Sequence, residues 1–196
     1  MVELLLSLLL AISASAASTS VCAKLTESKE LTRNLQCSNF NVQKRIQTKL
    51  PQANFMGSDL THSDWHQSDL SKGNFKNTVM DRMSAQKTDF SDSLFLQTRA
   101  HAAHFDYSDF TQTDWSDSNI QGNRFTGAKF LRANMQRANL AFSDLRFANF
   151  TDADLRGADL TSCIWYGAVF KGAVVDKATK LPFPQQKAQE LGIIEK

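Results

Sequence analysis

Residues 133–160 read ANMQRANLAFSDLRFANFTDADLRGADL, in which every fifth residue from Met135 onward is apolar and the residue two before it is small. The same phase runs from Phe55 to Val175, and all 25 residues at these positions are apolar. Of the residues two before them, 23 are Ala, Ser, Thr, Gly or Cys, and 15 of the residues directly before them are Asp or Asn. A repeat this regular indicates a solenoid, in which each repeat packs on its neighbours.

A period of five fits neither an α-helix nor a plain β-strand. The small residue and the apolar residue share a face if the chain is extended between them, but the next pair begins three residues later, so each repeat needs a corner. Asp or Asn suits a corner because its side chain hydrogen-bonds nearby backbone. Regular corners produce a coil, and stacked coils bury a continuous core in which small residues leave space for large ones.

Several stretches, including Ala138-Asn139-Leu140, Ala148-Asn149-Phe150 and Ala153-Asp154-Leu155, resemble the A-(D/N)-(L/F)-x-x motif of the pentapeptide-repeat family. The resemblance covers about two-thirds of the chain and implies an all-β fold, a right-handed four-sided β-helix with one repeat on each side. With four repeats in a coil, residues 20 apart stack. The predicted core then includes one column of Leu70, Phe90, Phe110, Phe130, Phe150 and Phe170, and a second with Phe75, Phe95 and Trp115.

The chain divides into a leader-like segment, a repeat region and two flanking segments. We expect a signal peptide at residues 1–17, an N-terminal cap segment at 18–50, the β-helix at 51–177 and a C-terminal cap at 178–196. The apolar run from Leu4 to Ile12 is too short to span a bilayer, and Ala14-Ser15-Ala16 supplies a small-x-small cleavage pattern. Glu3 stands where basic residues are usual, and the alternative is a buried or frayed N-terminal helix.

Cleavage of this leader predicts an exported protein, periplasmic or extracellular, with no transmembrane span in its mature form. Without cleavage the protein is cytoplasmic. In an oxidising compartment Cys22 and Cys37 can pair as a disulfide. The alternative places Cys37 under the first coil and Cys22 in a free tail. Cys163, at a small position of the repeat, is expected to be buried and inert.

The C-terminal segment contains the signals of a short helix from Pro184 to Gly192, with Pro in its first turn and Gly just past its end. Phe183 and Leu191 are placed to cover the last coil. Such a cap protects the open strand edge that a β-helix would otherwise leave at its end.

Nothing in the sequence predicts a catalytic, cofactor or metal site, so we expect no enzyme. The histidines form two pairs, His62 with His66 and His101 with His104, whereas a metal site needs three or four converging ligands. The repeat is weakest over residues 78–104. This stretch is either a local irregularity with compensating packing or an outward loop, and the loop would be the place for a binding or active site.

A candidate partner surface combines outward aromatic residues with an acidic band. The residues are Tyr107, Phe142 and Phe147, with Asp106, Asp109, Asp114 and Asp117, and a basic stretch follows the band. Clustered exposed apolar residues mark contacts, and bands of opposite charge orient a partner. The plainer interpretation is an ordinary solvated surface, because single exposed aromatic residues are normal.

These observations favour a non-catalytic, exported scaffold or interaction module whose partner is a protein, with a homodimer as a further option. The alternative implied by the resemblance is a DNA-mimicking protein that binds the topoisomerase gyrase and confers quinolone protection. The net charge of +2 and the leader both oppose that alternative. The same small net charge argues against nucleic acid as a partner.

Overall fold

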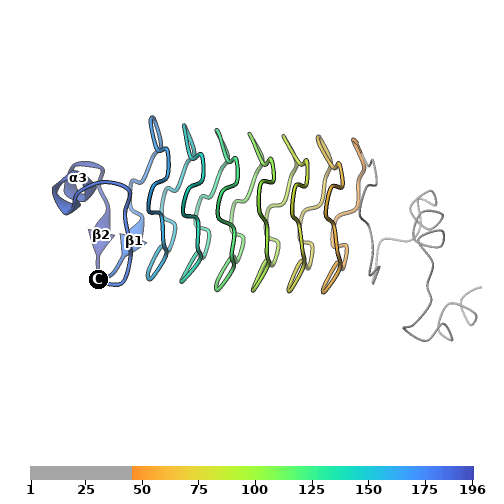
Figure 1. Ribbon diagram of the computed structural model, residues 1–196, viewed down its shortest axis with the longest axis horizontal. Coiled ribbons are helices and arrows are strands. Elements are labelled where there is room, and N and C mark those ends of the chain that lie inside the picture. The colour runs from red at the N-terminus through yellow and green to blue at the C-terminus, as the bar shows by residue number, and fades with distance from the viewer. Residues whose placement is uncertain (1–45) are drawn as a thin grey trace, which may run out of the picture.

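The computed structural model describes residues 46–196, so the predicted signal peptide and the Cys22–Cys37 pair lie outside the described residues. The described residues wind into a rod of stacked coils (Figure 1). Parallel bridges join residues 20 apart, from Lys49 with Asp69 to Asp154 with Val174. Four five-residue repeats therefore complete one coil, and the rod is a four-sided β-helix.

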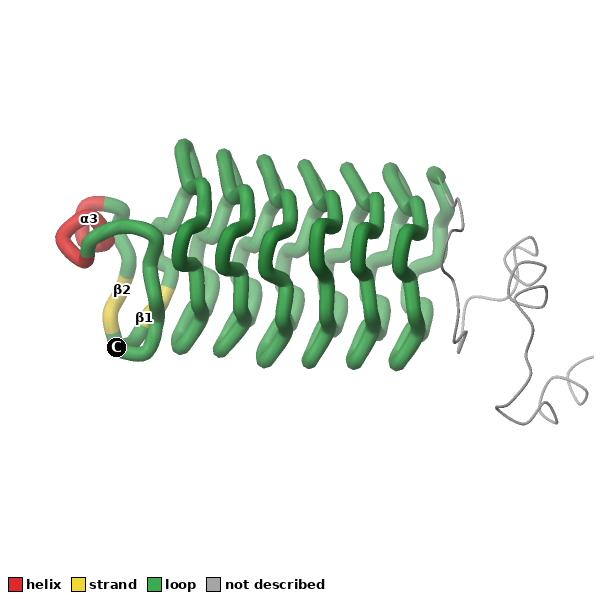
Figure 2. The backbone as a smooth tube through the Cα atoms, viewed as in Figure 1, coloured by secondary structure: helices red, strands yellow, loops and turns green. Residues whose placement is uncertain are grey.

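Turns and single bridge residues make up nearly the whole rod (Figure 2). The regular elements gather at its C-terminal end, where β1 (Val174–Val175) pairs in parallel with β2 (Ile194–Glu195), and α3 (Gln185–Glu190) lies between them in the chain. Within the coils, each apolar centre from Leu50 to Leu160 donates its backbone N–H to the coil that follows, as Phe90 does to the Asp109 carbonyl at 2.8 Å. The backbone of the repeat is thus paired between coils.

Each corner of the regular coils, at every fifth residue from 47 to 172, places its second residue in the left-handed region of backbone space. The φ angles of the 20 non-glycine residues there lie between 54° and 63°. The turn is closed by a backbone bond such as Ser93 N–H to the Phe90 carbonyl at 3.2 Å, and the Asp89 carboxylate accepts the Ser91 N–H at 2.9 Å. This is the corner role expected for Asp and Asn.

The core is a set of stacked aromatic columns. Successive rings from Phe90 to Phe170 have centroids 4.9 to 5.2 Å apart and lie within 11° of parallel. All nine residues predicted for the core are at most 1% exposed. Burial of each large apolar side chain contributes about 1.5–3 kcal/mol relative to exposure, so this column is a major source of stability.

The small position of the repeat also carries hydrogen bonds between coils, which the sequence interpretation missed. The Thr88 hydroxyl donates to the Trp65 carbonyl at 2.8 Å, and the Thr98 hydroxyl donates to the Phe75 carbonyl at 2.7 Å. The Ser93 hydroxyl accepts the Gly73 N–H at 2.9 Å. Ser and Thr at these positions therefore add hydrogen bonds between coils, in addition to leaving space for the large side chains.

Residues 78–104 form regular rungs, which contradicts the outward-loop alternative. The bridges Val79 with Arg99 and Ser84 with His104 continue the 20-residue register. Met83 is buried at a small position two residues before the small centre Ala85, so the exchange of sizes conserves volume. Asn123, the other exception, is buried as well.

The Asn123 amide donates to the carbonyls of Ala100, at 3.0 Å, and Ile120, at 2.8 Å. The large Asn123 side chain thus lies next to Ala100, the second small residue at an apolar centre within residues 78–104. Both irregularities are packing adjustments within a continuous rod.

The two ends of the repeat differ from the expected boundaries. Residues 46–50, assigned to the N-terminal segment, already form a turn and a rung, and Leu50 is buried. At the other end, Asp159 pairs with Lys180, 21 residues later, which shifts the register by one. Residues 194–195 form the strand β2 where only a helix and tail were expected.

The α3 helix lies at the C-terminal end of the rod (Figure 1). It begins after Pro184 and ends at Glu190, and Gly192 has a φ of 74°. The Phe183 ring packs on Trp165 at 4.6 Å and on Phe170 at 5.5 Å, measured between centroids. These contacts cover part of the last apolar layer.

Candidate protein-binding surface

The four acidic residues predicted for a partner surface are spread around the rod and already have partners. Because residues 20 apart stack, the acidic residues of the band lie beside residues of the following coil, most of which are basic. No single side of the described rod collects the acidic band. The contacts are Asp106 with Arg124 at 3.1 Å, Asp109 with Lys129 at 3.1 Å, Asp117 with Arg137 at 2.6 Å, and Asp114 with the Asn134 amide at 3.0 Å.

These pairs neutralise the surface locally. The Arg137 guanidinium, through its hydrogen bonds, lowers the pKa of Asp117, and Arg146 lowers the pKa of Asp144 in the same way. Residues 46–196 contain 17 basic and 17 acidic side chains. The described rod thus presents neither a strongly acidic nor a strongly basic face.

Four large apolar side chains are exposed together on one side of the rod, and we call them the aromatic patch. Phe142 is 69% exposed, Phe147 56%, Ile164 55% and Tyr166 73%. Phe142 and Phe147 occupy the two corners that flank residues 143–146. Ile164 lies on the same side in the next coil, because Asp144 is its bridge partner. Tyr166 contacts Phe147 edge-on, with ring centroids 5.6 Å apart.

Glycines in neighbouring coils hold two of the exposed rings close to the backbone. A Cβ atom at Gly167 would lie 2.5 Å from the Phe147 ring, and one at Gly127 would lie 2.6 Å from the Tyr107 ring. Each ring therefore covers the glycine one coil further on. Tyr107 shares the corner of Phe147 but lies two coils away, about 10 Å by strand spacing.

The structure thus brings Phe142 and Phe147 together and leaves Tyr107 at the margin. Ile164 and Tyr166 were absent from the predicted surface. A signal for Ile164 was present in the sequence, since it replaces the usual Asp or Asn before an apolar centre. Tyr166 stands at an outward position of the repeat, so the pattern marks it as exposed, but the pattern does not show its contact with Phe147.

The charged groups of this side are paired with one another. The Arg146 guanidinium donates to both carboxylate oxygens of Asp144 between the two corner phenylalanines. One coil nearer the N-terminus, Arg124 pairs with Asp106, and Asp106 is only 5% exposed. The second carboxylate oxygen of Asp106 is buried without a hydrogen-bond partner among the described residues. The patch is therefore apolar and locally neutral.

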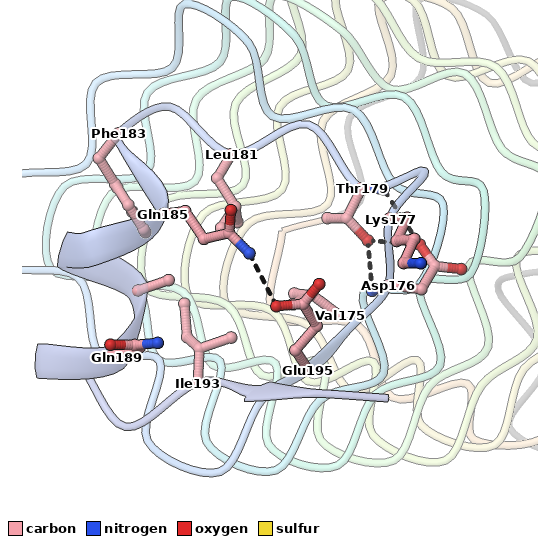
Figure 3. A pocket seen from close by; sticks show the side chains of 11 residues that line it. Val175, Asp176, Lys177, Thr179, Leu181, Phe183, Gln185, Gln189, Ile193 and Glu195 are labelled. Atoms are coloured by element: carbon pink, nitrogen blue, oxygen red, sulfur yellow. Dashed lines mark hydrogen bonds between the residues drawn. The ribbon is translucent and has the colours of Figure 1, made fainter.

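A cavity of about 470 Å³ lies between α3, the segment before it and the β1–β2 pair (Figure 3). Val175 and Ile193 contribute apolar lining, and the Gln185 amide donates to the Glu195 carboxylate at 2.8 Å. The backbone N–H of Gly157 holds the pKa of Asp176, another lining residue, below its usual value. These polar groups serve the packing of the cap, so the cavity is a weaker candidate than the aromatic patch.

The remaining reactive side chains have structural contacts. Among residues 46–196, no three His, Cys, Asp or Glu residues are close enough to hold a metal ion. His66 contacts the Asp64 carboxylate through Nδ1 at 2.7 Å, and the His101 Nδ1 lies 3.3 Å from the Gln121 carbonyl. Cys163 is buried, its thiol donates to the Leu140 carbonyl, and burial raises its pKa to about 11. A search of the described part of the chain for a helix able to span a membrane finds none.

A family model for pentapeptide repeats matches more than half of the chain in eight copies. The matches cover residues 46–77, 101–136, 118–157, 133–172 and 153–179. No curated protein sequence matches the chain significantly.

Solved structures with the same fold include a trypsin-treated variant of QnrB1, described as a plasmid-mediated fluoroquinolone resistance protein. It is 15% identical with a TM-score of 0.50, and the match covers 83% of this chain and 93% of that one. HetL from Nostoc sp. strain PCC 7120, involved in heterocyst differentiation regulation, is 18% identical with a TM-score of 0.34, covering 71% and 76%. Rfr23 from Cyanothece 51142 is 18% identical with a TM-score of 0.37, covering 82% and 97%.

Proposed function

This chain belongs to the pentapeptide-repeat family. Because its coils form a solenoid whose outer side chains are free to contact other molecules, we propose that the protein is an exported, non-catalytic protein-interaction module. The aromatic patch carries the proposal. Three of its four side chains are Phe or Tyr, and aromatic residues are enriched where partners bury surface. The module contacts a protein partner through this side of the rod.

The repeat supports binding because it holds the patch in place. The corners that carry Phe142 and Phe147 are fixed by bonds from their own N–H groups to the Thr161 and Tyr166 carbonyls of the next coil, both at 3.0 Å. A surface that is already ordered loses little conformational entropy when a partner binds. Binding energy is therefore not spent on folding the site.

The non-catalytic character is supported by the engagement of the polar side chains. Carboxylates such as Asp144 and Asp154 are bound by arginines two residues later, which lowers the pKa of each. A general acid or base near neutral pH needs the opposite shift. The buried Cys163 thiol, with its raised pKa, is a poor nucleophile.

Export rests on the leader at residues 1–17. Cell fractionation followed by N-terminal sequencing tests it. We expect a mature protein outside the cytoplasm that begins after Ala16 or Ala17. Recovery of an uncleaved chain beginning at Met1 in the cytoplasm would overturn the export part of the proposal.

Site-specific photo-crosslinking tests the interaction surface. A benzophenone amino acid replaces Tyr166 in the patch or, as a control, Met56, which is 40% exposed near the other end of the rod. Irradiation of intact cells should give a defined protein adduct from position 166 and none from position 56. Equal labelling at both positions, or none at either, would contradict a specific surface.

A gyrase-protecting DNA mimic is the second candidate, on the strength of the shared fold with QnrB1. The equal numbers of acidic and basic side chains in residues 46–196 argue against it, because a DNA mimic requires a strongly negative surface. A supercoiling assay with gyrase, quinolone and purified protein separates the two candidates. We expect no protection at stoichiometric amounts, and protection would reverse the ranking.

A further inference from the structure

We propose that the partner at the aromatic patch is the same patch on a second copy of this chain, so that two rods pair side to side. This inference rests on the proposed function, because it names the partner of the same surface. It follows from the area of the patch, its charges, the positions of its rings and the polar residue at the end of the coil.

The exposed area fits one half of a dimer interface. Aromatic side chains offer about 150–250 Å² each, so the three patch rings at their observed exposures present roughly 400 Å², and the half-exposed Ile164 adds to this area. Val169, 43% exposed on the adjoining side, and the polar groups around the patch extend this area. A standard interface buries about 800 Å² on each partner, so the apolar patch would form the centre of such an interface and its polar rim the remainder.

The charges of the patch permit a like surface to approach. Arg146 is bound to Asp144 and Arg124 to Asp106, so neither arginine requires an acidic group from the partner. Two copies of this surface meet without repulsion between like charges. A partner selected by charge would instead need unpaired groups on this side of the rod.

The positions of the rings suit a twofold axis parallel to the rod. Phe142 lies at one corner of the patch side, and the Phe147–Tyr166 pair lies at the other. Rotation about such an axis places Phe142 of each copy opposite the Phe147–Tyr166 pair of the other. The same contact then forms twice, as closed symmetric dimers require, and edge-on aromatic contacts are favourable.

The C-terminal end of the coil disfavours pairing by stacking rods end to end. Glu195 in β2 is in register with Val175, a position that is apolar in every earlier coil. A charged side chain on the inward register of an edge strand opposes further strand addition. The Glu195 carboxylate also accepts a hydrogen bond from the Gln185 amide within the same chain, so it is already paired without a second rod.

Sedimentation velocity of the purified mature protein tests the proposal with variants taken from the repeat itself. Phe142→Gln introduces glutamine, which the chain itself carries at the equivalent corner position 112. Ile164→Asn introduces asparagine, which is common directly before the apolar centre of a repeat. The matched control is Leu94→Asn, which replaces a 38% exposed apolar residue at the same repeat position outside the patch. Circular dichroism melts establish that each variant is folded.

We expect wild type and Leu94→Asn to be dimers at micromolar concentration. The F142Q/I164N variant should bind itself at least about tenfold more weakly, equivalent to about 1.4 kcal/mol. Even a weak dimer would form at roughly 100 micromolar, so a wild-type protein that is still monomeric there would overturn the proposal. A dimer that the two patch substitutions leave unaffected would overturn it as well.

Mass spectrometry of the adduct formed at position 166 in cells distinguishes this inference from the proposed function. Adducts joining two copies of the chain support it. Adducts exclusively with another protein overturn the second-copy assignment and leave the interaction module standing. The absence of any adduct overturns both.

Discussion

Single residues at the corners determine how the rod presents its outer side chains. Every corner requires a left-handed residue, yet only some of these positions are glycine. Gly167 is one of them, and its missing Cβ is where the Phe147 ring lies. Gly57 has nearly the same φ, 69° against 71°, but nothing lies within 4 Å of a Cβ built there.

This contrast predicts different effects for the same substitution. Gly57→Ala should lose about 1–2 kcal/mol, the penalty of a left-handed L-residue. Gly167→Ala should lose more, because the ring of Phe147 must also move, and it should weaken the aromatic patch. Urea unfolding of both variants measures the difference, and equal losses would show that the ring does not depend on this glycine.

A buried hydroxyl at the small position makes a second residue-scale prediction. Thr88→Val keeps the shape of the side chain but removes the hydrogen bond to the Trp65 carbonyl. The carbonyl keeps its bond from the Ser68 N–H, so the variant loses one of two hydrogen bonds, a loss of about 0.5–1.5 kcal/mol. Chemical denaturation should show a loss in that range, whereas an unchanged midpoint would mean that the hydroxyl is only a spacer.

Ion pairs within and between coils set the acid stability of the rungs. Arg146 lowers the pKa of Asp144 in the folded protein, so this carboxylate binds a proton less readily than it does in the unfolded chain. Its stabilising contribution is complete above the ordinary Asp pKa of about 3.9 and is lost as pH falls through the lower folded value.

We therefore expect Asp144→Asn to reduce stability at neutral pH by about 0.2–1 kcal/mol, the range for pairs that water partly screens. At a pH well below the ordinary Asp pKa of about 3.9, the variant and wild type should converge. Thermal melts from neutral pH down to about pH 2 provide the comparison. A difference that persists undiminished at the acid end would exclude the ion pair as its source.

At the scale of elements, periodicity predicted the rungs well because packing enforces it at every coil. The Phe90 to Phe170 column and the Asp and Asn corners follow directly from the five-residue pattern. The β2 strand was missed because Ile194 and Glu195 continue the ladder only after α3 interrupts the repeat. The hydroxyl bonds of Thr88 and Ser93 were missed because a pattern of small residues does not distinguish space from hydrogen bonding.

At the scale of the whole molecule, the candidate surface depends on the number of sides in a coil. The five-residue period gives corners but not their number, and the four sides came from the family resemblance. Only with 20 residues per coil does Ile164 lie beside Asp144 and Tyr166 beside Phe147. The same stacking sets Asp117 against Arg137, which replaces the expected charge bands with neutral pairs.

Electron spin distances measured between labels at Gln52 and Asp152 test this register most directly. The background variant carries Ser at Cys22, Cys37 and Cys163, and excess unlabelled protein suppresses distances between copies. Both positions lie at one corner, five coils apart, so a rod with four repeats in each coil places their backbones about 24 Å apart along its axis. A coil of three repeats would instead separate them by about 32 Å, and that result would contradict the four-sided rod and the patch built on it.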